Sequence, residues 1–287
     1  MIQDIAPHAL RNEFVPGARP KPGDTVFRFA QGKLIGAFRE GALRLPTWEA
    51  LGKPRVRYLF SLDGNNMFLC LDADGTVPEG MEPLSVRALR TKDAAGRPAI
   101  FAAWTAWQLA NWYLDNRYCG RCGGETEDAA DERCIVCPAC GRRIYPRIIP
   151  AVIVGVTDGD RLLLTRYNRP GAYHALVAGF TEIGETLEET VRREVKEETG
   201  LDVEHVRYYK SQPWGIVDDL LAGFFCDVTG DTEIRMDDRE LKEAVWTCRE
   251  DIDGQPDSFS LTNEMMMLFK AGLEPKWRPE PWMAFKT

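Results

Sequence analysis

The chain has 287 residues, a net charge of −8 at pH 7 and a hydrophobic fraction of 44%. This composition is that of a globular protein with about two domains, and it excludes a disordered or low-complexity chain. The acidic balance argues against nonspecific binding to nucleic acid, and no apolar run is long enough to span a bilayer, so no membrane contact is expected. Because the first residues are too polar for a signal peptide, we expect a cytoplasmic protein.

Residues 1–115 are predicted to form an N-terminal α/β domain. Short apolar segments with turn residues between them, such as Asp63-Gly64, predict strands. A helix is expected from Ala99 to Leu114, because its large apolar side chains recur at steps of three and four. The tryptophans of this helix could stack on a base, but packing in the core is the simpler interpretation. The predicted strands are residues 26–29, 33–38, 56–62 and 67–71.

Five of the eight cysteines fall within 22 residues. Two CxxC pairs, Cys119 with Cys122 and Cys137 with Cys140, are separated by fourteen residues, which is close to the spacing of a closed, tetrahedral zinc site. Cys134 and Cys137 form a competing pair, but the glycine after Cys140 favours a knuckle turn there. A redox pair is the alternative, and it would need a helix N-terminus that the predicted loops do not supply. We therefore predict one structural Zn²⁺ per chain.

The zinc ribbon is expected over residues 116–147, followed by an α/β domain over residues 148–273 and a C-terminal tail over residues 274–287. In the α/β domain, apolar segments on either side of Asp158-Gly159-Asp160 predict a β-hairpin. Further strands are predicted at residues 206–210, 220–228 and 244–247, and helices at residues 187–199 and 261–271.

The first helix of this domain carries carboxylates on two faces. At about 100° per residue, Val191 and Val195 mark the side that packs in the core. Glu189 falls on the opposite side, where surface ion pairs explain an acidic residue. Glu194 and Glu198 fall on the packed side, where an unpaired carboxylate is costly unless it binds a metal ion.

Glu194, Glu197 and Glu198 converge because they lie at positions i, i+3 and i+4, and Glu185 just before the helix can join them. Oxygen ligands of this kind suit Mg²⁺ or Mn²⁺. Such an ion can hold phosphate oxygens and activate water, so the cluster predicts metal-assisted hydrolysis of a phosphoanhydride. Several glutamates could deprotonate the water, so the general base stays open.

The stretch from Gly179 to Leu201 fits every fixed position of the Nudix box, Gx5Ex7REUxEExGU, where U is aliphatic. The chain therefore resembles the Nudix hydrolases, which cleave nucleoside diphosphates linked to another moiety. The resemblance implies an α/β/α sandwich around a mixed sheet, a catalytic Glu185 and an Arg193 that orients the cluster. The Mg²⁺ or Mn²⁺ contacts that it implies are Glu194, Glu197, Glu198, Glu240 and the backbone carbonyl of Ala178.

A zinc ribbon ahead of the box resembles the NADH pyrophosphatase subfamily, which implies hydrolysis of NAD(H) to nicotinamide mononucleotide and AMP. The segment from Ser211 to Trp214 matches the start of the SQPWPFPxS signature of that subfamily, but residues 215–219 depart from it, which leaves the dinucleotide open. A homodimer is also implied, in which Tyr145 of one subunit and Phe180 of the other enclose a substrate ring. The implied substrate contacts are Glu132, Tyr145, Phe180, Gln212, Pro213, Trp214, Asp219 and Thr262.

Two other functions stay open. The NAD cap of an RNA 5′ end contains the same scissile bond in a sterically open form. A nucleic-acid-binding or ligand-sensing regulator belongs to a different class of function. The intact glutamates of the box argue against an idle site, and the net charge of −8 argues against a nonspecific nucleic-acid reader.

Overall fold

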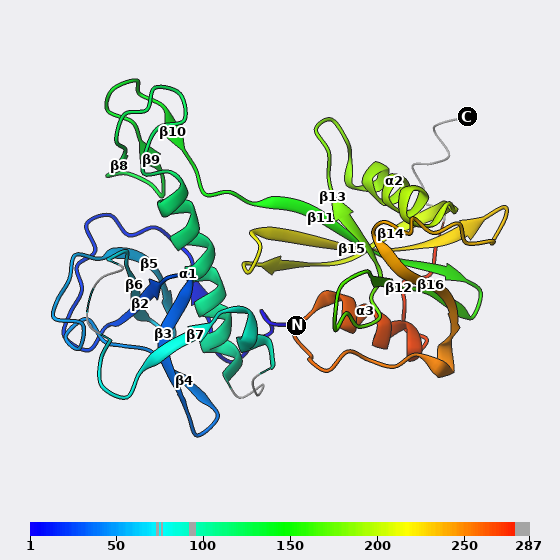
Figure 1. Cartoon of the computed structure of the whole chain (residues 1–287), viewed down its shortest axis with the longest axis horizontal. Coiled ribbons are helices and arrows are strands. Elements are labelled where there is room, and N and C mark those ends of the chain that lie inside the picture. Colours follow the sequence, from blue (N-terminus) through cyan, green and yellow to red (C-terminus); the bar gives the residue numbers. More distant parts are fainter. Residues whose placement is uncertain (73–74, 76, 92–95, 279–287) are drawn as a thin grey trace. The chain divides into compact units, whose positions relative to one another are not determined.

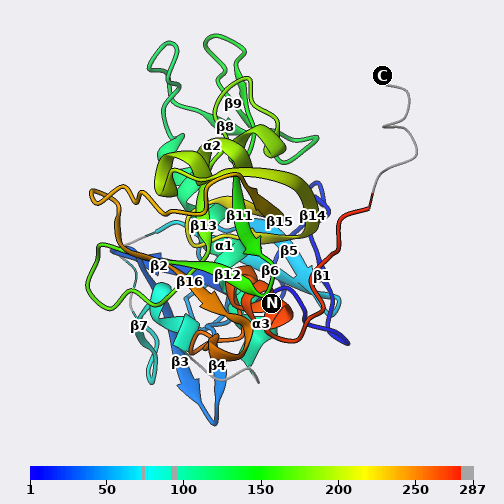
Figure 2. The same ribbon diagram turned by 90° about the vertical axis from the view of Figure 1, so that its right-hand side faces the viewer.

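The computed structural model describes residues 1–72, 75, 77–91 and 96–278, and the chain divides into two compact units. The first unit comprises residues 2–148 and 214–218, and the second comprises Met1, residues 149–213 and the chain from Asp219 onward. Residues 2–115 and the ribbon over residues 116–147 both fall within the first unit. Figures 1 and 2 show the elements of both units.

The first unit is built on a sheet with the strand order β1-β5-β6-β2-β3-β4, in which β7 also pairs with β3. The four strands predicted here are confirmed, and Gly64, with φ of 78°, forms the predicted turn between β5 and β6. β2 runs parallel to β6. The strands are β1 (Leu10–Arg11), β2 (Thr25–Ala30), β3 (Lys33–Arg39), β4 (Ala42–Arg44), β5 (Arg57–Leu62), β6 (Asn65–Cys70) and β7 (Glu82–Ser85).

Helix α1 (Arg97–Asp115) packs against this sheet. Trp104 and Trp112 are buried, so the prediction that these tryptophans belong to the core is confirmed. The indole Nε1 of Trp104 donates to the carbonyl of Val86 at 3.2 Å, which satisfies its one polar group.

The ribbon follows α1 and forms a small sheet in the order β10-β9-β8. Its strands are β8 (Glu127–Asp128), β9 (Ile135–Val136) and β10 (Arg143–Ile144). Arg57 of β5 donates to Asp128 of β8 at 2.8 Å, which ties the ribbon to the N-terminal sheet. A segment this short has little apolar core of its own, so a metal site is the expected source of its stability.

The second unit is a mixed sheet with the strand order β14-β15-β11-β12-β16, in which β13 also pairs with β11. β11 and β15 are parallel, whereas β12 and β13 run antiparallel to β11. The strands are β11 (Ile149–Asp158), β12 (Arg161–Tyr167), β13 (Val177–Phe180), β14 (Asp202–Trp214), β15 (Asp219–Thr229) and β16 (Leu241–Cys248).

Helices α2 (Leu187–Thr199) and α3 (Leu261–Lys270) cover opposite faces of this sheet (Figures 1 and 2), which confirms the predicted α/β/α sandwich. Val152 and Val154 of β11 point to α2 and form one core with Val191 and Val195. Because alternate residues of a strand face opposite sides, the same strand supports both helices. In the described part of the chain, no helix is both long and apolar enough to cross a membrane.

Residues 274–278, the start of the predicted C-terminal tail, contact the rest of the second unit. Glu274 is 5% exposed, and both of its oxygens accept hydrogen bonds from Arg249 at 3.1 Å. The carbonyl of Pro275 accepts from Arg207, and the ring of Trp277 lies 4.1 Å from that of His205. The rest of the predicted tail, residues 279–287, lies outside the described residues.

Candidate functional site

Helix α2 has the predicted bounds because both of its ends are capped. Thr186 and Glu189 form a capping box, in which the hydroxyl of Thr186 accepts from the N–H of Glu189 and the carboxylate of Glu189 accepts from the N–H of Thr186. Gly200 ends the helix with φ of 73°, a left-handed conformation that glycine adopts without strain. The caps fix the register of the carboxylates between them.

The packed side of α2 contains carboxylates, as its periodicity predicts. Glu198 is 3% exposed and lies beside the fully buried Val191 and Val195. Glu194 is also largely buried, whereas the side chain of Glu197 is 60% exposed. The sector that contains Glu194 and Glu198 is therefore the packed one.

Arg193 joins the acidic residues of the site. Its Nε and Nη2 donate to the two oxygens of Glu185 at 2.6 and 2.9 Å, and its Nη1 donates to Glu194 at 2.8 Å and to Glu197 at 3.0 Å. Nη2 also donates to the carbonyl of Phe180. The hydrogen bonds from Arg193 lower the pKa of Glu185 to about 2, so this carboxylate is ionised.

Glu198 has the opposite electrostatic environment. Its Oε2 atom is buried and has no hydrogen-bond partner among the described residues. Burial, and then the negative charges of Glu194 and Glu240, raise the pKa of Glu198 to about 8. A divalent cation would be the positive partner that this buried carboxylate lacks. The oxygen ligands around it therefore fit Mg²⁺ or Mn²⁺.

One pocket of about 370 Å³ contains these carboxylates, and it lies entirely within the second unit. Its carboxylates surround the pocket more loosely than a closed metal site would. Among the described residues, the only group of three or more His, Cys, Asp or Glu side chains whose ligand atoms all lie within 4.8 Å of one another consists of cysteines. The pocket is lined by Glu194, Glu197, Glu198, Asp237, Arg239 and Glu240.

Strand β13 approaches α2 closely at Gly179. A Cβ atom at this position would overlap the carboxylate of Glu194, so only glycine leaves that carboxylate in place. The carbonyl of the neighbouring Ala178 accepts from the hydroxyl of Tyr167 at 3.2 Å. Burial, and then the charge of Glu198, raise the pKa of Tyr167. Tyr167 comes from β12, and no local pattern in the sequence predicts its place beside these carboxylates.

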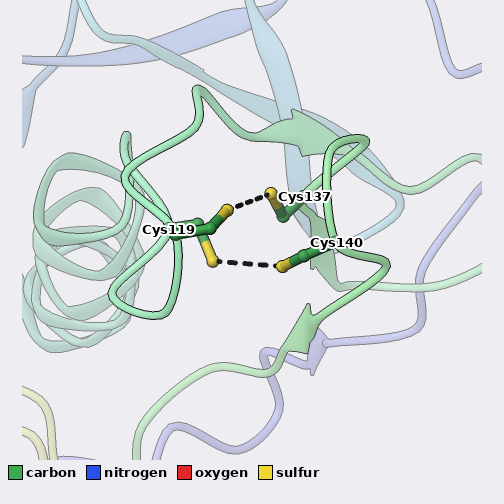
Figure 3. A group of neighbouring side chains, drawn as sticks. Cys119, Cys137 and Cys140 are labelled. Atoms are coloured by element: carbon green, nitrogen blue, oxygen red, sulfur yellow. Dashed lines mark hydrogen bonds between the residues drawn. The ribbon is translucent and has the colours of Figure 1, made fainter.

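The cysteine quartet consists of Cys119, Cys122, Cys137 and Cys140. Figure 3 shows Cys119 beside Cys140. The Sγ atoms of these two residues are 3.7 Å apart, and those of Cys122 and Cys137 are 3.5 Å apart. Tetrahedral zinc with Zn–S bonds of about 2.3 Å requires about 3.8 Å between sulfurs, so the quartet fits zinc. Cys134 donates to the carbonyl of Ile135 and is not a member, which answers the question that the spacing left open.

The two knuckles have the same backbone geometry. The N–H of Gly123 donates to the carbonyl of Cys119, and the N–H of Gly141 donates to that of Cys137, each at 2.8 Å. Both glycines have positive φ, at 74° and 71°. Gly141, the glycine after the second CxxC pair, therefore forms the predicted knuckle turn.

Glu132 and Tyr145, implied as substrate contacts, lie together in the ribbon. The Tyr145 hydroxyl donates to Glu132 at 2.9 Å, and Arg143 donates to the same carboxylate at 2.6 Å. The hydrogen bond to Glu132 raises the pKa of Tyr145. Tyr145 is 53% exposed, so its ring is not packed in a core. Arg143 was missed because nothing in its spacing distinguishes it from a surface arginine.

Gln212 differs from the expectation of a substrate contact, because it is fully buried. Its Nε2 donates to the carbonyl of Phe259 and its Oε1 accepts from the N–H of Leu261, each at 2.7 Å. These bonds hold the start of α3. Thr262, in the first turn of α3, is half-buried, and Asp219, the first residue of β15, is buried.

Trp214 also packs within the protein. Its ring lies 5.0 Å from that of Trp104 in an edge-to-face arrangement, and the guanidinium of Arg90 lies 5.4 Å from its centre. Gly215 follows, and a Cβ there would collide with the backbone of Trp104. This contact explains why glycine stands where the subfamily signature continues with proline. Pro213 and Phe180 are exposed.

Comparisons with known proteins agree with this architecture. A family model for the NUDIX domain matches residues 147–266, and one for the NADH pyrophosphatase zinc ribbon domain matches residues 114–145. A crystal structure of a NUDIX hydrolase from Nitrosomonas europaea aligns with a TM-score of 0.48 at 20% identity, over 56% of this chain and 96% of that chain. The domain matches confirm the resemblance carried by the box and the cysteines.

Two similar proteins share the name "NAD-capped RNA hydrolase NudC". The one from Stutzerimonas stutzeri (strain A1501) is 39% identical over 178 residues, 61% of this chain and 63% of that protein. The one from Escherichia coli O157:H7 is 42% identical over 147 residues, 50% of this chain and 56% of that protein. The chain thus spans less than two thirds of the length of these relatives.

Proposed function

We propose that this chain, which belongs to the Nudix hydrolase family through its Nudix domain and its NADH pyrophosphatase zinc ribbon, hydrolyses the pyrophosphate bond of an NAD group. The observation that carries the proposal is the pocket in the second unit, where Glu194, Glu197, Glu198 and Glu240 are brought together. A pocket with this charge repels a phosphate unless cations bind first, so we propose a metal-dependent reaction.

We assign these four glutamates, with the carbonyl of Ala178, to Mg²⁺ or Mn²⁺. Bound there, such ions would stabilise the charge of the phosphates and make a nearby water more acidic. Arg193 holds two of the glutamates and is itself held by Glu185, so it orients the cluster.

We propose that the cysteine quartet holds one structural Zn²⁺, since four sulfurs leave no ligand position open for substrate. The eight cysteines form no disulfide with one another. Cysteines spaced for zinc suit a reducing compartment, so we propose a cytoplasmic protein.

Two substrates contain the bond in question, free NAD(H) and the NAD cap of an RNA. The names of the relatives at about 40% identity favour the capped RNA as a second substrate. Phe180 and Tyr145 are each 53% exposed, and we assign them to stacking on a ring of the substrate.

The experiment is turnover of NADH, ADP-ribose and NAD-capped RNA with Mg²⁺ or Mn²⁺, with the products identified by mass. We expect reduced nicotinamide mononucleotide with AMP from NADH, and nicotinamide mononucleotide with a 5′-monophosphate RNA from the capped RNA. A protein that binds capped RNA in a gel shift but releases no product would be a regulator, and the proposal would then be wrong.

The matched variants are Glu198→Gln and Glu188→Gln. Glu198→Gln keeps the shape of a buried side chain but removes its charge, so turnover should fall by about two orders of magnitude or more while folding survives. Glu188 is exposed on the same helix and should tolerate the change. Glu189, also on the solvated side, is a poorer control because it belongs to the capping box. Equal losses at Glu198 and Glu188 would contradict the assignment.

A further inference from the structure

Arg239 is a cation in the rim of a pocket that otherwise presents carboxylates. The other arginine near these carboxylates, Arg193, already donates to Glu185, Glu194 and Glu197 and to the carbonyl of Phe180. A pyrophosphate link brings further negative charge into this pocket. Phosphate oxygens that the metal ions do not bind therefore need another partner, a side chain whose hydrogen-bond donors are not yet used.

Asp237 fixes the side chain of Arg239. The Nε atom donates to the two oxygens of Asp237 at 3.0 and 3.2 Å, and Nη2 donates to one of them at 2.6 Å. The N–H of Arg239 donates to the same carboxylate at 3.0 Å. Four contacts on one carboxylate hold the guanidinium in a defined orientation.

Asp237 is itself anchored to the helix that carries the glutamates. Its N–H donates to the carbonyl of Glu198 at 3.0 Å, and its carbonyl accepts from the N–H of Leu241 at 3.0 Å. Its side chain is 20% exposed, against 85% for that of Arg239. The anchor is therefore part of the folded domain, while the arginine it holds remains open to a ligand.

The interactions of Arg239 with Asp237 use only one edge of the guanidinium, formed by Nε and Nη2. Among the described residues, no hydrogen-bond partner contacts Nη1. An arginine can bind a carboxylate through one edge and a phosphate through the other, because its five donors lie in one plane.

We propose that Arg239 binds a phosphate oxygen of the nucleoside diphosphate link, and that Asp237 is the positioning residue that holds it at the pocket rim. The inference rests on the proposed hydrolysis and adds a residue outside the Nudix box to it. Arg239 contributes charge and orientation to the substrate, whereas the glutamates hold the metal ions.

The kinetic test uses NADH with Mg²⁺ and four variants. Arg239→Gln should lower kcat/KM by about 10- to 100-fold, the range for losing a charge-assisted hydrogen bond, with most of the loss in KM. Arg239→Lys should recover part of it, because it keeps the charge but not the planar donors. Asp237→Asn should raise KM by a smaller factor. Arg235→Gln is the control, because that exposed arginine pairs with Asp231 and Glu233 and does not line the pocket.

The binding test needs no turnover and uses methylenediphosphonate, a non-hydrolysable analogue of pyrophosphate, in isothermal titration with Mg²⁺ present. Arg239→Gln should weaken its binding about tenfold or more, while binding of Mg²⁺ alone stays as in the wild type. Wild-type values of KM and analogue affinity in Arg239→Gln would overturn the inference and leave the proposed hydrolysis standing. A wild-type protein that turns over no NAD compound would instead overturn the proposed function, and the binding test would still decide whether Arg239 holds phosphate.

Discussion

The backbone of β13 at Gly179 lies directly against the carboxylate of Glu194. A Cβ there would overlap the carboxylate of Glu194, so Gly179→Ala must displace that carboxylate from the pocket. We expect turnover to fall about 10- to 100-fold, since displacements near 1 Å cost this much in a preorganised site. Steady-state turnover and Mg²⁺ affinity measure the effect. Unchanged values for both would mean that Glu194 has room to move.

At the scale of single residues, the sequence predicts what local spacing controls. The helical position of Glu198 relative to Val191 and Val195 predicts that this carboxylate is buried, and it is buried in the structure. Tyr167 and Arg239 could not be found in this way. Both lie outside the box along the chain. Tyr167 of β12 reaches the carbonyl of Ala178 on β13, and Arg239, just before β16, lines the pocket, so only the folded domain brings them near the glutamates of α2.

At the scale of elements, the ribbon offers a test that separates two neighbouring cysteines. Cys137→Ser removes one member of the quartet, so bound zinc and thermal stability should be lost together. Cys134→Ser, three residues earlier and also buried, should keep the zinc, because its sulfur lies outside the quartet and donates to the carbonyl of Ile135. Zinc content by mass spectrometry and the melting temperature are the measurements. If Cys134→Ser lost its zinc and Cys137→Ser kept it, Cys134 would be the zinc ligand instead of Cys137.

The sequence predicts where an element begins and ends only if capping or turn residues mark those ends. Helix α2 begins at a capping box and ends at a glycine, and both are visible in the sequence. Strand β14 extends over residues 202–214, beyond the predicted 206–210, because the flanking residues, several of them polar, continue the strand, and one of them, Gln212, is buried. A matching residue type does not by itself establish a role in substrate binding. Gln212 matches the signature, but its side-chain amide is hydrogen-bonded to the backbone of Phe259, just before α3, and of Leu261, its first residue.

At the scale of the whole molecule, long-range contacts decide what the sequence could not. Glu274 belonged to a predicted tail, yet it is buried beside Arg249. Burial alone would raise the pKa of Glu274, but the hydrogen bonds from Arg249 and Lys276 outweigh it and hold the pKa below its ordinary value. No local sequence pattern predicts that Glu274 pairs with Arg249, which lies 25 residues away along the chain.

This pairing makes stability depend on pH in a defined direction. Because the pKa of Glu274 is lower in the folded state, its contribution is present above the unfolded value of about 4.3 and is lost as pH falls further. Glu274→Gln should therefore lower the free energy of unfolding by about 1–3 kcal/mol at pH 7, and by much less near pH 3. Urea unfolding at both pH values measures this. The exposed Glu250→Gln is the control, and an equal loss for Glu274→Gln at both pH values would contradict the ion pair.

Tyr145 provides the test of a dimer. Its ring is exposed, and its hydroxyl is held by Glu132, which Arg143 also binds, so the ring is presented at the surface rather than packed in a core. If this ring completes the site of a second copy, Glu198→Gln and Tyr145→Ala inactivate different halves of one composite site.

Each variant alone should then be nearly inactive, while a mixture of the two should regain activity. Random pairing makes half of the dimers mixed, and each mixed dimer has one site with both residues intact, so recovery should approach about a quarter of wild-type turnover. The mixture must be allowed to exchange subunits, and light scattering gives the mass of the active species. A recovery that never exceeds the sum of the two variants, or a fully active monomer, would show that Tyr145 serves its own chain or none.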